Sequence, residues 1–400
     1  MNTTPNSNRT HIAIFGKRNA GKSSIINTIT NQNIAIVSSI AGTTTDPVKK
    51  AIEINTIGAC VIIDTAGFDD EGELGILRIE KTKKIMESID IAILIFDASE
   101  KNDDYLLELK WKNKLKALEI PVIAVINKID LNDNFKLIEE NVKNIFDIDT
   151  VSISALKNIN IDKLIETIKL TIPKIEKISI VGHIVKEDDI VMLVMPQDIQ
   201  APNGRLILPQ VQTIRDILDN KAIVIASTFD KFEKSLKALK SPPKIIITDS
   251  QVFKEVEKLK PEKSDLTSFS VLFARYKGDE NIYKKGAEFI DKLNKNSKLL
   301  IAESCTHIPL EGDIGRVKIP NLLKNKFGFD FNIDYVSGND FPNDLSKYDL
   351  VIHCGGCMGT RKNILNRIRI CEDQNIPITN YGMTIAKINN VKYIYRQLIK

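Results

Sequence analysis

Gly16-Lys17-Arg18-Asn19-Ala20-Gly21-Lys22-Ser23 matches the phosphate-binding pattern G-x-x-x-x-G-K-S. An apolar run, His11–Phe15, precedes it and a helical stretch follows it, so the loop should join a strand to a helix, as the motif requires. Its glycines let backbone N–H groups wrap phosphates, and the helix N-terminus adds a favourable dipole. The stretch therefore predicts a P-loop nucleotide-binding domain of the α/β class.

The side chains at the end of this loop have expected roles in binding. Lys22 should reach the β- and γ-phosphates, and the Ser23 hydroxyl should bind Mg²⁺. Further contacts to the nucleotide are expected from Asn19, Ala20, Gly21 and Ser24.

Three later motifs indicate which nucleotide is bound. Asp64-Thr65-Ala66-Gly67 ends a buried strand, so Asp64 can hold the Mg²⁺ shell and the Gly67 N–H can touch the γ-phosphate. Asn127-Lys128-Ile129-Asp130 also follows a strand, and the Asp130 carboxylate can accept hydrogen bonds from the N1 and N2 donors of guanine. Adenine would leave that carboxylate unpaired, at roughly 1–3 kcal/mol. Because Ser154-Ala155-Leu156 lies where a guanine-contacting loop should be, the four elements predict GTP with Mg²⁺.

The segment Ala41–Asp46 resembles a switch of known GTPases. It is similar to the G-T-T-R-D switch I of the translation-factor-like branch that includes Era and the tRNA-modifying GTPases, with Thr45 in place of Arg. The resemblance implies that Thr44 contacts Mg²⁺ and the γ-phosphate, and that Asn19 supports potassium-stimulated hydrolysis. Phe68 stands where Ras-type enzymes place a glutamine, and a phenyl ring cannot orient water, so slow hydrolysis is expected, with K⁺ supplying charge. The expected catalytic residues are Lys22, Thr44, Gly67 and Asn19.

Strand-like and helix-like segments alternate along the chain, which indicates mainly parallel sheets flanked by helices. We expect a disordered segment at 1–10, a GTPase domain at 11–173, a dimerisation domain at 174–262 and a metal-binding domain at 263–400. The strands expected in the first are His11–Phe15, Cys60–Ile63, Ile91–Phe96, Val122–Ile126 and Val151–Ile153. Those of the second are Ile190–Met195, Ala222–Ala226 and Lys244–Thr248, with a helix at Pro209–Asp219. Those of the third are Ser270–Phe273, Leu299–Ala302, Asn332–Val336, Leu350–Ile352 and Pro377–Asn380.

Two groups of thiols and imidazoles follow predicted strands of the third domain, namely Cys305-Thr306-His307 and His353-Cys354-Gly355-Gly356-Cys357. In a parallel sheet both groups reach the carboxyl edge, where open α/β sheets place their ligands. The two glycines allow a turn that directs Cys354 and Cys357 to one centre. Zinc favours four ligands, and five donors are present here. An iron–sulfur cluster favours thiolates, and three cysteines leave one iron to another ligand. From the residues alone both metals remain open.

A GTPase of this branch followed by C-x-H … H-C-x-x-C resembles the FeFe-hydrogenase maturation GTPases, the HydF family. The segment Gln200–Gln212 is also similar to the middle domain of that family. The resemblance implies a homodimer built by the middle domain and a 4Fe-4S cluster in the last. It implies a scaffold that accepts a diiron precursor from radical-SAM maturases and delivers it to apo FeFe-hydrogenase. The implied cluster ligands are Cys305, Cys354 and Cys357, with His307 or His353 as an exchangeable fourth.

Composition limits the other classes of function. The chain has 400 residues with 56 basic and 52 acidic side chains, and the lysines are interspersed with acids, so no footprint for nucleic acid is expected. Its apolar runs are shorter than the roughly 18 residues of a membrane span, and its cysteine usage fits a reducing compartment, so a cytoplasmic location is expected. Cys60 and Cys371 are expected in the core. The alternatives are a tRNA-modification or ribosome-assembly GTPase with a structural zinc tail, and a redox sensor that gates GTP hydrolysis.

Overall fold

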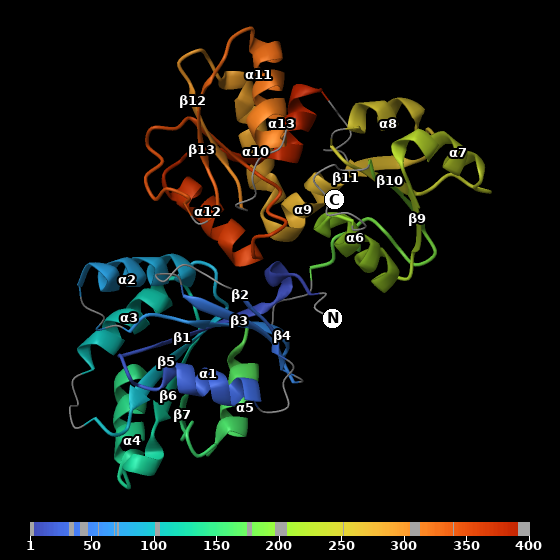
Figure 1. Ribbon diagram of the computed structural model, residues 1–400. Coiled ribbons are helices and arrows are strands. Elements are labelled where there is room, and N and C mark those ends of the chain that lie inside the picture. Colours follow the sequence, from blue (N-terminus) through green and yellow to red (C-terminus); the bar gives the residue numbers. More distant parts are fainter. Residues whose placement is uncertain are drawn as a thin grey trace. The chain divides into compact units, whose positions relative to one another are not determined.

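The computed structural model of the chain describes residues 4–31, 36–40, 47–54, 56–67, 69, 72–100, 105–173, 178–196, 206–250, 252–304, 313–338 and 340–390. The chain divides into two compact units, Met1–Ile175 and Glu176–Lys400 (Figure 1). Within the described ranges, no helix combines the length and the apolar character needed to cross a membrane. Short 3-10 turns lie at Asn6–Asn8, Ile129–Leu131, Phe229–Lys231 and Ile290–Lys292, and a π-helical turn at Ile314–Lys318.

The first unit contains a seven-stranded sheet with the order β2-β3-β4-β1-β5-β6-β7. Its parallel strands are β1 (Thr10–Gly16), β4 (Gly58–Asp64), β5 (Ile91–Asp97), β6 (Val122–Asn127) and β7 (Thr150–Ser152). The antiparallel strands β2 (Ile36–Ile40) and β3 (Val48–Ile54) extend it beside β4. All five predicted strands of this unit are confirmed.

Helices cover both faces of this sheet, because its central strands are apolar on both sides. Helices α1 (Lys22–Asn31) and α5 (Ile161–Thr171) pack on the face that carries Ile12 and Ile14. Helices α2 (Gly72–Met86), α3 (Leu106–Ala117) and α4 (Phe135–Phe146) pack on the face that carries Ala13 and Phe15 (Figure 1). The loops at the carboxyl ends of the strands are thereby held between two rigid layers.

The second unit contains two parallel four-stranded sheets. The first, ordered β11-β10-β8-β9, consists of β8 (Ile190–Val194), β9 (Ile223–Ser227), β10 (Ile245–Thr248) and β11 (Asp265–Ser268). Helices α6 (Leu208–Asp219) and α9 (Phe269–Lys277) cover the face of Val191 and Leu193. Helices α7 (Phe232–Lys237) and α8 (Phe253–Leu259) cover the opposite face.

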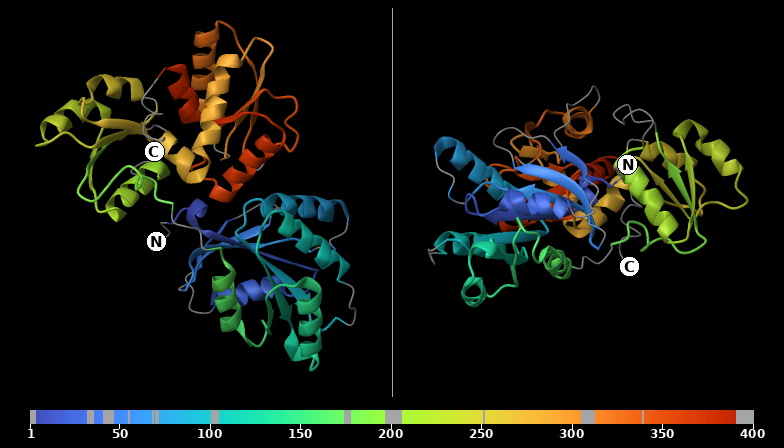
Figure 2. Two further views of the ribbon diagram at one scale, coloured as in Figure 1. Left: turned by 180° about the vertical axis from the view of Figure 1, so that it is seen from behind. Right: turned by 60° about the horizontal axis from the view of Figure 1, so that its bottom comes forward.

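The second sheet of this unit, ordered β13-β12-β14-β15, positions the cysteine motif. Its strands are β12 (Lys298–Ala302), β13 (Asn332–Val336), β14 (Leu350–His353) and β15 (Ile378–Asn380). Helix α12 (Arg361–Asp373) packs on the face of Leu300 and Val351, and α11 (Ile319–Phe327) with α13 (Tyr381–Ile388) on the face of Leu299 and Ile301 (orange to red in Figure 2). Helix α10 (Glu280–Phe289) lies against β15 so closely that a Cβ at Gly286 would come within 2.0 Å of the Ile378 carbonyl oxygen.

The mainly parallel architecture is confirmed, and one predicted strand is wrong. Residues 270–273 are not a strand but belong to helix α9, whose N-cap Ser268 accepts a hydrogen bond from the Val271 N–H. A short apolar run has the same pattern in a buried helix as in a buried strand, and here the serine cap decides between them. Strands β2, β3 and β11 were not predicted. Cys60 and Cys371 are fully buried, as expected.

Candidate functional site

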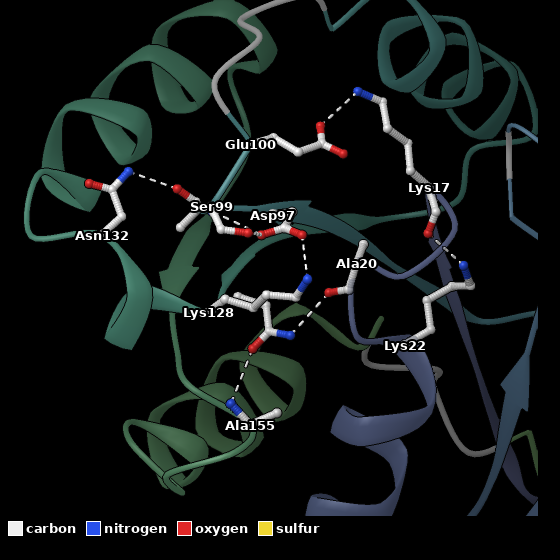
Figure 3. Close-up of polar contacts among 11 residues, drawn as sticks. Lys17, Ala20, Lys22, Asp97, Ser99, Glu100, Lys128, Asn132 and Ala155 are labelled. Atoms are coloured by element: carbon white, nitrogen blue, oxygen red, sulfur yellow. Dashed lines mark hydrogen bonds and ion pairs between the residues drawn. The ribbon is translucent and has the colours of Figure 1, made fainter.

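The P-loop is joined to the predicted guanine-binding motifs by one buried side chain. The Asn127 Nδ2 donates to the Ala20 carbonyl oxygen at 3.0 Å, and its Oδ1 accepts from the Ala155 N–H at 3.1 Å (Figure 3). Gly21 has a φ of +95°, and a Cβ at that position would come within 2.2 Å of Asn127 Nδ2. Glycine is therefore required there both by the backbone conformation and by the close packing of Asn127.

The predicted phosphate- and magnesium-binding side chains lie together at the carboxyl ends of β1 and β4. The Ser23 hydroxyl donates to Asp64 Oδ2 at 2.7 Å, so two of the three predicted Mg²⁺ ligands are neighbours. The Lys22 ammonium donates to the carbonyl oxygens of Gly16 (3.1 Å) and Lys17 (2.7 Å) within its own loop, and Figure 3 shows the contact to Lys17. The Lys22 ammonium suits a nucleotide phosphate, and the Ser23 hydroxyl beside the Asp64 carboxylate suits a hard cation.

The loop that begins with Asp64 is anchored to the strand that precedes the P-loop. The Thr65 hydroxyl donates to the Ile14 carbonyl oxygen at 2.6 Å, and Gly67 follows in a buried position. The Asp69 carboxylate accepts from the Arg18 N–H at 2.6 Å. The predicted residues Thr44, Thr45 and Phe68 lie outside the described residues.

The residues predicted to bind guanine follow β6 and β7. A hydrogen bond from the Ser154 hydroxyl lowers the pKa of Asp130, which keeps the carboxylate an acceptor at neutral pH. The Lys128 ammonium forms an ion pair with Asp97 at the end of β5 (Figure 3). The side chains predicted to read the base are therefore brought to one edge of the sheet.

A group of charges behind the P-loop was not predicted. The Lys17 ammonium lies 3.1 Å from Glu100 Oε2 and 3.5 Å from Glu108 Oε1 (Figure 3 shows the first contact). Glu108 is buried, and its burial raises the pKa of its carboxyl group although the Lys17 ammonium opposes this. The three residues line a small cavity together with Asp97. In the sequence, the only sign of this network is the lysine side chain of Lys17 inside the P-loop.

The two strand ends that carry the cysteine motif are neighbours, as predicted. Ala302 of β12 pairs with His353 of β14, and the Cys354 N–H donates to the Ala302 carbonyl oxygen at 2.8 Å. The chain is described up to Ser304, and Cys305 and His307 lie outside the described residues. The parallel register thus brings Ser304, which precedes Cys305 in the sequence, and Cys354 to one edge of the sheet.

The Cys354 thiol is surrounded by backbone donors. Its sulfur accepts from the Ser304 N–H at 3.0 Å and from the Gly356 N–H at 3.4 Å. Gly356 has a φ of +63°, and a Cβ there would meet Ile364 Cδ1 at 2.8 Å. Cys354 and Cys357 are half-buried free thiols, and burial followed by the nearby Cys354 raises the pKa of Cys357, while Lys277 opposes this. Backbone N–H groups thus hold the Cys354 sulfur in position, and cysteine sulfur is the donor atom that iron–sulfur clusters and zinc prefer.

His353 is held by hydrogen bonds on both ring nitrogens. Its Nε2 lies 2.9 Å from Arg367 Nη1, and its Nδ1 lies 2.6 Å from the Cys354 carbonyl oxygen. The side chain is fully buried, and burial together with Arg367 lowers its pKa to about 3. The neutral ring therefore donates through Nδ1 and accepts through Nε2. Metal ligation through Nε2 would require the Arg367 contact to break.

The donor set fits a thiophilic metal. Two thiols lie on one tight turn, and backbone donors point at the sulfur of the first, as iron–sulfur clusters and zinc sites require. Within the described part of the chain, no three His, Cys, Asp or Glu side chains are grouped closely enough to hold a metal. The third thiol of the motif, Cys305, belongs to the segment that is not described.

Family models match most of the chain. The hydrogen maturase F dimerization domain matches residues 180–278, and the hydrogen maturase F tetramerization domain matches residues 281–398. The 50S ribosome-binding GTPase family matches residues 11–128, which makes the first unit a GTPase domain.

Individual relatives match part of the chain. The tRNA modification GTPase MnmE of Endomicrobium trichonymphae is 39% identical over 159 residues, which are 39% of this chain and 34% of that protein. GTPase Der of Campylobacter hominis is 34% identical over 165 residues, 39% of this chain and 35% of that protein. The chain thus spans about a third of the length of these curated relatives. Among solved structures, Aquifex aeolicus Era bound to GDP.AlF4- is 24% identical with a TM-score of 0.35, and the alignment covers 55% of this chain and 92% of that one.

Proposed function

This chain belongs to the hydrogen maturase F family, and from this premise we propose that it is a GTP-hydrolysing scaffold for a metal centre. It binds a 4Fe-4S cluster, accepts a diiron precursor of the FeFe-hydrogenase active site and delivers it to the apo-hydrogenase. The observation that carries the proposal is the meeting of the β12 and β14 ends, where the Cys354 N–H bonds to Ala302 and the Ser304 N–H to the Cys354 sulfur. The GTPase domain in the same chain is proposed to be the switch of this scaffold.

The GTPase is proposed to act as a slow switch. Lys22 and the Gly67 N–H stabilise charge on the γ-phosphate, while Ser23, Asp64 and Thr44 hold Mg²⁺. Asn19, exposed on the P-loop with a φ of +61°, is proposed to support a K⁺ ion beside the phosphates. Phe68 cannot orient the attacking water, so K⁺ should accelerate hydrolysis in this protein.

The cluster is proposed to bind through Cys305, Cys354 and Cys357. When bound, it supplies an iron with an exchangeable position, at which the diiron cargo can be held and released. Since Arg367 and the Cys354 carbonyl oxygen occupy both nitrogens of His353, we favour His307 as the exchangeable ligand. The backbone donors around the Cys354 sulfur keep that thiolate in place.

The sheet of β8 to β11, which we call the middle sheet, is proposed to form the homodimer, because its strands lie in the region matched by the dimerization domain. Strand β9 is at the end of this sheet, and its residue Ile223 is 50% exposed. Val211 and Leu218 of the adjoining helix α6 are also exposed. An apolar edge strand offers backbone N–H and C=O groups to a second copy of the chain. The partners are then a second copy, the radical-SAM maturases that supply the cargo and the apo-hydrogenase, in the cytoplasm and without nucleic acid or membrane.

The proposal is tested by purifying the protein without oxygen and measuring iron, acid-labile sulfide and zinc per chain, with an EPR spectrum after reduction. About four irons per chain and a reduced-cluster signal, both lost in Cys354→Ala, are expected for a 4Fe-4S scaffold. Protein loaded with a synthetic diiron precursor should then activate apo-hydrogenase. One zinc without sulfide would contradict the scaffold and favour a tRNA-modification or ribosome-assembly GTPase, the classes that the names of a curated relative and of the GTPase family model suggest.

A further inference from the structure

Helix α9 connects the middle sheet to the sheet that carries the cysteine loop. Phe269 and Phe273 pack into the core between α9 and the middle sheet. Val271 and Ala274, on another side of the helix, pack into the core that also contains Leu300 of β12. One helix is therefore part of both cores, and its last residues lie next to the Cys354–Gly359 turn, which we call the cysteine loop.

The C-terminal end of α9 makes polar contacts to the cysteine loop and to the helix that follows it. The Lys277 ammonium donates to the carbonyl oxygens of Gly359 at 2.6 Å and Cys357 at 3.5 Å. The Arg361 side chain, at the start of α12, donates through Nε to the Tyr276 carbonyl oxygen at 3.2 Å. Two adjacent residues of α9, Tyr276 and Lys277, thus contact both ends of the segment from Cys357 to Arg361.

Lys277 is more deeply buried than lysines usually are. The residue is 3% exposed. Among the described residues, its ammonium contacts carbonyl oxygens and no acidic side chain. A buried cation without an acidic partner costs free energy. Since a 4Fe-4S cluster held by three thiolates carries net negative charge, a cation at this place is compensated when the cluster binds.

We propose that Lys277 is a positioning residue for the cluster: it fixes the cysteine loop through the Cys357 and Gly359 carbonyl oxygens and places a positive charge beside the cluster. This inference rests on the proposed function, because it needs a cluster at Cys354 and Cys357. Two effects follow. The loop is held in the shape that presents Cys357, and the added electron of the reduced cluster is stabilised by the nearby charge.

The test compares wild type with Lys277→Met, Lys277→Arg and Lys260→Met, all purified without oxygen. Lys260 is a matched control, because its ammonium also donates to two carbonyl oxygens, those of Pro261 and Ser264, but outside the cysteine loop. The midpoint potential of the bound cluster is measured by EPR-monitored titration, and iron release by transfer to the chelator bathophenanthroline. Lys277→Met should have a more negative potential and several-fold faster iron release, Lys277→Arg should restore both in part, and Lys260→Met should match wild type.

The outcomes separate this inference from the function on which it rests. Wild type without iron and sulfide overturns the proposed function and this inference with it. Wild type with a cluster, together with an unchanged potential and release rate in Lys277→Met, overturns the role of Lys277 alone. If Lys277→Met binds no cluster, its GTP hydrolysis and oligomeric mass show whether it is folded. Recovery of the cluster in Lys277→Arg then supports the proposal, and failure to recover it contradicts the proposal.

Discussion

The Nε2 atom of His353 lies 2.9 Å from Nη1 of Arg367, inside the sheet edge that carries the cysteine loop. Arg367 also donates to the carbonyl oxygens of Glu303 and Gly338, which follow the neighbouring strands β12 and β13. One guanidinium group therefore ties together the ends of β12, β13 and β14. The imidazole is one of the acceptors that surround this buried cation.

Replacing His353 by Gln should leave the cluster in place. The Gln side chain has an oxygen that can accept from Arg367, and it removes the imidazole as a metal ligand. Iron and sulfide per chain and the EPR spectrum of His353→Gln should match those of wild type, whereas Cys357→Ala should lose both. A loss of iron in His353→Gln at unchanged thermal stability would show that the imidazole ligates the cluster.

Asp130 should determine the choice of base. An Asp130→Asn variant exchanges part of the acceptor for a donor, so guanine loses a partner for its N1 and N2 donors, while the C2 carbonyl of xanthine gains one. GTP should bind more weakly by about 1–3 kcal/mol, roughly 5- to 150-fold, and XTP more tightly than in wild type. Equilibrium binding of fluorescent analogues of both nucleotides measures this. Asp133→Asn, an exposed neighbour, is the control, and equal losses in both variants would argue against base reading by Asp130.

The sequence was sufficient to predict strands where long apolar runs precede a recognisable motif or are long enough to be buried on both sides. His11–Phe15 before the P-loop and Ile91–Phe96 are buried on both sides, so they cannot be amphipathic helices, and the structure has them as β1 and β5. The meeting of the strand ends β12 and β14, which precede the two motif segments, could also be predicted, because parallel neighbours bring their carboxyl ends to one edge.

Tertiary contacts decide what the sequence left open. Helix α9 packs into two cores, so the apolar residues in the stretch from Phe269 to Ala274 are buried on more than one side, and a short apolar run of this kind does not distinguish helix from strand. The contacts of Lys277 to Cys357 and Gly359 join residues about eighty positions apart, and no local pattern signals them. The ion pair between Glu108 and Lys17 likewise forms only in the folded unit, because the two residues are far apart in the sequence.

His11 should make the first unit less stable in mild acid. Burial, followed by the nearby Lys49, lowers the pKa of His11 from 6.5 to about 4. Between these values the unfolded chain binds a proton that the folded chain does not, so stability falls as pH drops from about 6.5 to about 4, by at most about 3 kcal/mol. Urea unfolding followed through Trp111, the one tryptophan of the chain, reports on this unit.

A His11→Gln variant supplies the comparison for this pH dependence. Trp111 packs on Phe15 of the same strand as His11, at 5.7 Å between ring centroids, so its fluorescence follows the unfolding of this strand. As pH falls, the unfolding free energy of wild type should decrease relative to that of His11→Gln. A difference that stays constant from pH 7 to pH 4.5 would mean that His11 takes up its proton equally in the folded and unfolded chain.

The apolar edge of the middle sheet should hold two copies of the chain together. Strand β9 pairs only with β8 in the described sheet, and Ile223 at its start is half exposed. An Ile223→Asp substitution places a charge on this edge, which opposes pairing with another strand. Light scattering after size exclusion should then show half the wild-type mass. Leu170→Asp, on an exposed face of α5 in the first unit, is the control and should leave the mass unchanged. A wild-type mass for Ile223→Asp would place the dimer contact away from β9.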